Sequence, residues 1–141
     1  AARADHVARL ILPALDAGRW VICDRFVDSS RAYQGGAGGL GDEAITALHA
    51  FGSGGLRPDL TILISVDPGR TAERLEKRDG GDSDAIGGRS EHYHASVAKS
   101  FLELAEREPT GFAVIDGNAT PQDVHLRVLD ALANRIEGFS S

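Results

Sequence analysis

The amino-acid sequence predicts an α/β fold, in which helices cover both faces of a parallel sheet. Short apolar segments rich in β-branched residues alternate with longer segments of helical periodicity, the order typical of parallel sheets. The segment at 60–67 is continuously apolar, as in a strand covered on both faces. With 141 residues, 42% of them hydrophobic and 26% charged, the chain has the size and composition of one globular domain. We therefore expect a single domain over residues 1–141.

The chain opens with a predicted helix over residues 3–17. Its apolar residues recur at helical spacing, and Gly18 is a natural stop. Pro13 is expected to bend this helix, because proline lacks the backbone N–H that the helix needs. The next segment, WVICDRF at 20–26, is short, apolar and rich in β-forming residues, which predicts a buried strand.

A glycine-rich loop at 35–41 precedes the second predicted helix. Asp42 has the side chain of an N-cap residue, and the apolar residues behind it follow helical spacing. The apolar face of this helix would consist of Ile45, Leu48 and Phe51. The continuously apolar segment LTILISVD at 60–67 then predicts the second strand.

The middle of the chain predicts a helix, a polar loop and another helix. Asp67 and Pro68 suit the cap and first position of a helix that runs to about residue 78. The polar segment at 79–89 is too long for a tight turn, and we expect it to act as a lid. Ser90 can cap the following helix, whose apolar stripe would be Tyr93, Val97, Phe101 and Leu104.

The last part of the chain predicts a strand and a helix. FAVID at 112–116 is the third expected strand. TPQD at 120–123 resembles a capping box with proline at the first helical position. The carboxyl ends of parallel strands meet at one edge of the sheet, where ligands of such folds bind. Asp24, Arg25 and Asp67 are therefore expected near the binding site.

The strongest chemical signal is Asp24-Arg25, at the end of the first expected strand. A carboxylate there can orient Mg²⁺ or its waters, and an arginine can grip a phosphate with two N–H groups. Ser30, Tyr33 and Gln34 follow, with hydroxyl and amide groups suited to a base and a sugar. A structural Asp–Arg ion pair beside a polar loop is the alternative.

The string CDRFVDSSRAYQGGAGGLG resembles the acceptor-site segment of the thymidylate kinases, DR(Y/F/H)-x-DS-x-x-AYQG. The preceding segment ARADHVARLILPALDAGRWVI, the strand RPDLTILISVDP and the ending DGNATPQDVHLRV are also similar to that family. The resemblance covers essentially all 141 residues. It implies the fold of the P-loop nucleoside monophosphate kinases and, for the complete enzyme, transfer of a phosphoryl group from ATP to dTMP.

The resemblance implies roles for individual residues. Arg25 would bind the dTMP phosphate, and Asp24 would organise Mg²⁺ and the phosphates; both are candidate catalytic residues. Arg3 would reach the thymine carbonyl. Tyr33 would stand against the 2′ position of the sugar and disfavour ribonucleotides. The residues expected to contact the base are Ser30 and Gln34.

The predicted lid departs from the family pattern. Bacterial thymidylate kinases often carry D-R-x-E there, whereas this chain has Asp84-Ala85, with alanine at the arginine position. Arg89 is the candidate replacement, and Lys77 or Arg78 are alternatives. An arginine in this place would stabilise charge on the phosphoryl group during transfer.

The family's first strand and its phosphate-binding loop have no counterpart in this sequence. No G-x-x-x-x-G-K-[ST] string, whose backbone amides cradle the donor phosphates, occurs in it. We therefore expect the chain to represent the C-terminal two-thirds of a thymidylate kinase-like domain; the alternatives are that the rest lies on another chain or that the donor site has been lost. The expected ligands are dTMP and ATP, with Mg²⁺ as cofactor and a homodimer as the assembly.

Two other function classes remain open. A nucleotide-binding module without catalysis would keep the acceptor residues and lack turnover. A dehydrogenase-like binder would rely on Gly36–Gly41, which fits G-x-G-x-x-G; such a loop should follow a strand directly, and residues 27–34 intervene. A tight or flexible turn is the favoured interpretation of these glycines.

Bulk properties exclude some partners. The net charge of −6 disfavours nucleic-acid binding, which usually needs a basic surface. No apolar run approaches the roughly 20 residues of a membrane span. The charged first ten residues do not resemble an export signal, and Cys23 is the only cysteine. We therefore expect a cytoplasmic protein that binds neither nucleic acid nor membrane.

Overall fold

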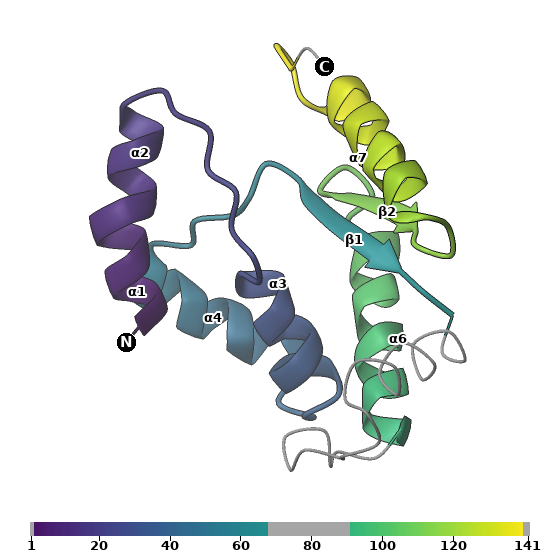
Figure 1. Cartoon of the computed structure of the whole chain (residues 1–141). Coiled ribbons are helices and arrows are strands. Elements are labelled where there is room, and N and C mark those ends of the chain that lie inside the picture. The colour runs from purple at the N-terminus through teal and green to yellow at the C-terminus, as the bar shows by residue number, and fades with distance from the viewer. Residues whose placement is uncertain (1, 68–90, 140–141) are drawn as a thin grey trace, which may run out of the picture. The chain divides into compact units, whose positions relative to one another are not determined.

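The structure, a computed structural model, describes residues 2–67 and 91–139 (Figure 1). The chain groups into two compact units, 1–57 and 58–141. The expectation of a single domain stays a prediction. The expected helix at 68–78, the lid at 79–89 and the Ser90 cap lie outside the described residues.

The first unit opens with a continuous helical segment in three parts, α1 (Ala2–His6), η1 (Val7–Ile11) and α2 (Leu12–Asp16). The middle part is π-helical, and the Leu12 N–H donates to the carbonyl of Val7, five residues back. This wider turn comes directly before Pro13 and accommodates a residue without an N–H. The predicted helix is confirmed, with a π-helical turn as the local adjustment.

The expected strand at 20–26 is wrong for this structure, which has extended and bent chain there. A strand forms only when its backbone can hydrogen-bond to a neighbouring strand. The described residues of the first unit contain no strand that could serve as this neighbour. The apolar side chains are left open to solvent: Trp20 is 61% and Ile22 99% exposed.

A second helical segment follows, made of α3 (Val27–Ser30) and the π-helical η2 (Arg31–Gly36). This helical segment was not predicted from the sequence. After the glycine-rich turn, α4 (Asp42–Ser53) begins behind Gly41, whose φ is 82°, and ends at Gly54 in the left-handed conformation. Both glycines provide backbone angles that other residues rarely adopt. The first unit buries Val7, Ile11, Val27, Ala32 and Ile45.

The predicted N-cap role of Asp42 is wrong. Asp42 is the first residue of α4, and the cap position belongs to Gly41, which has no side chain to donate or accept. The Asp42 carboxylate instead binds the Arg31 guanidinium. An ion pair with a buried arginine therefore takes the carboxylate that could have capped the helix.

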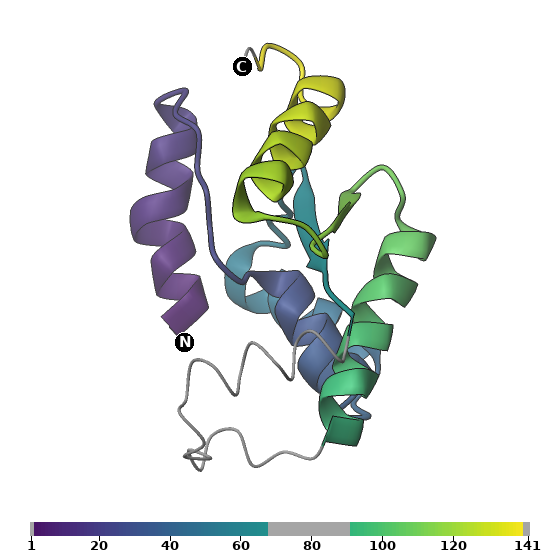
Figure 2. The same cartoon turned by 45° about the vertical axis from the view of Figure 1, so that its right-hand side comes forward.

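The second unit contains the parallel strands β1 (Thr61–Ser65) and β2 (Phe112–Asp116). Thr61 pairs with Phe112, and Ser65 with Asp116. Both strands match the predicted segments. Helices α6 (Glu91–Arg107) and α7 (Pro121–Arg135) lie on opposite sides of the strand pair in both views (Figures 1 and 2). This arrangement confirms the predicted α/β fold.

The second unit has its own core and a capped final helix. Its buried side chains come from α6 and β2: Val97, Leu104, Ala105, Phe112, Ala113 and Ile115. At the start of α7 the Thr120 hydroxyl accepts the N–H of Asp123 at 3.2 Å, and Pro121 holds the first position. The predicted cap is confirmed. Within residues 2–67 and 91–139, no helix combines the length and apolarity needed to cross a bilayer.

Candidate functional site

Arg25 lies in the connection between α2 and α3 and has an unusual backbone. Its φ is 58°, and among the described residues it is the one non-glycine residue with positive φ. A side chain in this region costs about 1–2 kcal/mol, and such costs cluster at functional sites. The backbone places the exposed Arg25 side chain against Tyr33 of η2.

The contact between Arg25 and Tyr33 has two parts. The Arg25 Nη2 donates to the Tyr33 hydroxyl at 2.9 Å, and the guanidinium carbon lies 5.1 Å from the ring centroid. A guanidinium carries five N–H donors, so one bond to Tyr33 leaves others for an anionic ligand. The described partner of Arg25 is thus Tyr33, and not Asp24 as in the alternative of a structural ion pair.

Arg3 and Ser30 form a second contact, between α1 and α3. The Arg3 Nη2 donates to the Ser30 hydroxyl at 2.7 Å and to the Phe26 carbonyl at 3.3 Å. The Arg3 guanidinium also lies 5.7 Å from the centroid of the Phe26 ring. Three contacts therefore hold this arginine beside Phe26 and Ser30, although residues 3 and 30 are far apart in the sequence.

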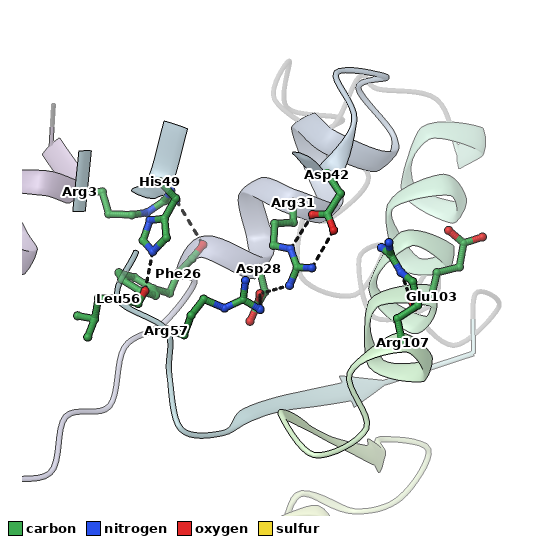
Figure 3. A network of polar contacts seen from close by, with 10 residues as sticks. All are labelled: Arg3, Phe26, Asp28, Arg31, Asp42, His49, Leu56, Arg57, Glu103 and Arg107. Atoms are coloured by element: carbon green, nitrogen blue, oxygen red, sulfur yellow. Dashed lines mark hydrogen bonds and ion pairs between the residues drawn. The ribbon is translucent and has the colours of Figure 1, made fainter. Parts of the chain in front are cut away.

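Phe26 itself is supported by α4. Its ring makes an edge-to-face contact with His49, with the two centroids 5.5 Å apart (Figure 3). His49 is 5% exposed, and its Nε2 bonds to the Leu56 carbonyl. Neither residue was singled out from the sequence. The sequence offered two signals for them. Phe26 is an aromatic residue directly after Asp24-Arg25, and His49 lies on the same face of its helix as Ile45.

Asp24 and Gln34 are exposed. Neither side chain takes part in the contacts described above for Arg3 and Arg25. Their predicted roles stay predictions. Arg89, the candidate lid residue, lies outside the described residues, as do Lys77 and Arg78. Of the predicted site residues, the structure brings together two pairs, Arg25 with Tyr33 and Arg3 with Ser30.

A network of charges around the buried side chains of Arg31 and Asp28 lies on the other face of the helical segment at 27–36 (Figure 3). Arg31 donates to both Asp42 carboxylate oxygens, at 2.6 and 2.8 Å, and to Asp28 at 3.1 Å. The Arg57 guanidinium lies 3.6 Å from Asp28. The Arg31 side chain is 3% exposed and that of Asp28 6%. Neither Asp28 nor Arg31 was a predicted site residue; their spacing of three along the sequence was the available signal.

The glycine-rich turn does not have the setting of a dinucleotide-binding loop. The helical segment η2, and not a strand, leads into these glycines. Gly39 and Gly41 have φ of 74° and 82°, which supports the interpretation of the segment as a tight turn.

The carboxyl ends of β1 and β2 are tied together by a DGN turn. The Asp67 N–H donates to the Asn118 side chain at 3.0 Å, and the Gly117 N–H donates to the Ser65 carbonyl at 2.7 Å. The Asn118 N–H, and after it the Arg127 guanidinium, lower the pKa of Asp116 from its ordinary value of 3.8. The donors stabilise the charged carboxylate, and this outweighs partial desolvation.

The described residues contain no group of three His, Cys, Asp or Glu side chains that could hold a metal ion. They therefore offer no all-protein cage for a cation. Mg²⁺ often binds through one carboxylate, waters and substrate phosphates, however, and the exposed Asp24 carboxylate fits that mode.

Comparison with known proteins identifies the family. The sequence pattern that defines the thymidylate kinases matches residues 1–128. A thymidylate kinase of Rhizorhabdus wittichii is 52% identical over 134 residues, which are 95% of this chain and 64% of that protein. Thymidylate kinases of Symbiobacterium thermophilum and Chromohalobacter salexigens are 42% and 40% identical, over 98% and 99% of this chain.

The chain spans 64% to 66% of the length of these three relatives. The match covers both structural units, since residues 1–128 include the acceptor segment, β1, β2 and the first part of α7. The chain therefore belongs to the thymidylate kinase family.

Proposed function

We propose that this chain forms the acceptor-nucleotide side of a dTMP kinase. In the complete reaction the γ-phosphoryl group of ATP passes to a phosphate oxygen of dTMP, and the products are dTDP and ADP. Such reactions ask for positioning and charge neutralisation more than for covalent chemistry by the protein. The observation that carries the proposal is the pair of arginines, Arg3 and Arg25, held on either end of one short segment.

Arg25 would bind the phosphate of dTMP. Its guanidinium is exposed, and the hydroxyl of Tyr33 holds it in a fixed direction at 2.9 Å. A planar guanidinium can donate two parallel N–H bonds to a phosphate, which fixes both distance and orientation. The left-handed backbone of Arg25 supports this role, because such strain is seldom kept without a functional reason.

Arg3 and Ser30 would recognise the base, and Tyr33 would face the sugar. Arg3 uses Nη2 for both Ser30 and Phe26, which leaves its other donors for the thymine carbonyl. Gln34 would add an amide on the same segment. Tyr33 would exclude a 2′-hydroxyl by its position beside Arg25.

Asp24 would help to hold Mg²⁺ on the nucleotide phosphates. The ion supplies charge neutralisation on those phosphates when bound. Arg89 would add positive charge from the lid. We further propose that the protein works in the cytoplasm as a homodimer and has no nucleic-acid or membrane partner.

The direct test is calorimetric titration of the folded chain with dTMP, with dCMP and dGMP as controls for the base. Arg25→Ala should weaken dTMP binding by roughly 2–5 kcal/mol, because the bound phosphate loses a charged partner. Arg9→Ala is the matched control: it removes the same charge from the same unit, at an exposed pair with Asp5. Unchanged affinity in Arg25→Ala would contradict the phosphate-binding role. A turnover assay with ATP separates a kinase from a module that only binds.

A further inference from the structure

The acceptor segment at 27–36 has two faces with different environments. Ser30, Tyr33 and Gln34 lie on the face that carries the proposed nucleotide contacts, and none of them is buried. The opposite face is buried throughout and consists of Asp28, Arg31, Ala32 and Gly35. Side chains three or four residues apart share one side of a helix, so the two faces are turned away from each other.

The buried face joins the segment to two other parts of the first unit. Arg31 grips Asp42 at the start of α4 with two bonds, of 2.6 and 2.8 Å. Asp28 contacts Arg31 at 3.1 Å and Arg57, just after α4, at 3.6 Å. Figure 3 shows the Arg31 guanidinium between the two carboxylates. The segment is thus attached to the start of α4 and to the connection that follows this helix.

Gly35 adds a steric constraint to these polar contacts. A Cβ at this position would lie 3.3 Å from the Gly41 carbonyl oxygen and 3.3 Å from Cγ1 of Ile45. A side chain at this position would therefore crowd Gly41 and Ile45, so glycine lets the segment pack against the start of α4 without moving these neighbours. A small rotation about its own axis would break the two-bond contact of Arg31 or force Gly35 into its neighbours.

Burying these charged side chains costs desolvation free energy, which offsets much of the attraction between them. Well-packed apolar residues of similar volume often stabilise a fold as much or more, whereas buried ion pairs can specify one geometry. The fork of an arginine on a carboxylate fixes direction as well as distance. The network is better suited to setting the orientation of the segment than to raising stability.

We propose that Arg31, with Asp42 and Asp28, is a positioning residue that sets the rotation of the acceptor segment and thereby the selectivity for dTMP. This inference rests on the proposed function. The contacts of Arg3 with Ser30 and of Arg25 with Tyr33 require both side chains at their present angles around the segment. A segment that turned would separate both pairs at once, although Arg31 itself touches no nucleotide.

The test uses Arg31→Lys, which keeps the charge and loses the two-bond fork. The matched control is Arg9→Lys, the same change at an exposed pair whose arginine side chain is 79% exposed. Asp42→Asn is the second variant; its side chain is 27% exposed, so it is the milder change to the fold. Affinities for dTMP and dCMP are measured by calorimetry at a temperature where circular dichroism shows every variant folded.

We expect both network variants to weaken dTMP binding by roughly tenfold to a hundredfold, the effect of misplaced contacts. The ratio of dTMP to dCMP affinity should fall as well, whereas Arg9→Lys should match the parent chain in both. A merely structural role would lower the unfolding temperature and leave the affinity and ratio of the folded protein unchanged; that result overturns the inference alone. A folded parent chain that does not prefer dTMP overturns the proposed function, and the inference with it.

Discussion

Arg25 has an exposed guanidinium and a backbone conformation that favours glycine over residues with a side chain. Its φ of 58° lies in the left-handed region, where the Cβ atom crowds the following carbonyl. A single bond to Tyr33 and a contact with its ring are the described interactions of the side chain. The backbone conformation of Arg25 therefore lowers the free energy of unfolding, but it places the guanidinium against Tyr33.

Arg25→Gly should be more stable than Arg25→Ala by about 1 kcal/mol, because glycine has no Cβ to strain at positive φ. Both variants should lose dTMP affinity to a similar extent, since both lack the guanidinium. Urea unfolding and calorimetry measure the two effects separately. Equal stability of the two variants would show that the backbone at this position is not strained.

Gly117 is a second position where the surrounding atoms leave no room for a side chain. It is buried, and a Cβ would lie 2.7 Å from Cγ2 of both Ile64 and Val66, and 3.0 Å from the Ser65 carbonyl oxygen. Its N–H also continues the pairing of β2 with β1. No side chain fits here without movement of the strand ends.

Gly117→Ala should lower the free energy of unfolding by roughly 1–3 kcal/mol through overpacking. Gly111→Ala is the control, because its Cβ would lie 3.6 Å from the nearest atom, the Glu108 carbonyl oxygen. Chemical denaturation of the two variants compares them directly. A Gly117→Ala protein as stable as the control would mean that the turn yields easily.

At the scale of elements, the segment around Trp20 shows that apolar, β-branched sequence does not suffice for a strand. Trp20, Val21 and Ile22 are 61%, 36% and 99% exposed. FAVID at 112–116 has a similar composition and does form a strand, because β1 offers it five paired residues. The two segments therefore differ in whether a neighbouring strand is present to pair with them, and not in their β-propensity.

The exposure of Trp20 can be measured directly, because it is the only tryptophan in the chain. We expect its fluorescence to be quenched by acrylamide nearly as strongly as that of N-acetyltryptophanamide, since most of the side chain faces solvent. The same titration in urea gives the unfolded reference. Strong protection in the native chain would instead support the buried strand that the sequence predicts.

The net charge of the chain changes as the pH falls. The chain carries 21 acidic and 15 basic residues, so its net charge rises from −6 as carboxylates take up protons. Asp116, at the end of β2, holds its charge more firmly than an ordinary aspartate. The N–H of Asn118 and then the guanidinium of Arg127 lower the pKa of this carboxyl below 3.8.

A pKa that is lower in the folded state gives stability that is complete above the unfolded value. This stability is lost as the pH falls through the folded value. For Asp116 the loss should therefore begin near pH 3.8 and grow below it. Asp116→Asn should show a shallower decline of the free energy of unfolding in this acid range. Urea unfolding at a series of pH values tests this, with Asp130→Asn as a charge-matched control; parallel curves for the parent and Asp116→Asn would contradict it.

Local sequence patterns were enough to predict strands β1 and β2, the capped helix α7 and the first helix, although the predicted bounds differ slightly from the observed ones. These elements carry their causes locally, in β-branched runs, helical spacing and the Thr120 cap. The acceptor residues could also be found from the sequence, because Arg25, Ser30 and Tyr33 stand in a family motif. Their roles remain proposals.

Pairs between groups that are far apart in the sequence became visible in the folded chain alone. The sequence could not show that 20–26 pairs with no strand among the described residues, that Asp42 binds Arg31 and not its own helix, or that His49 supports Phe26. Each outcome depends on what a distant part of the chain offers. A buried arginine competes for a carboxylate more strongly than the first turn of a helix does, since its charge has no access to water.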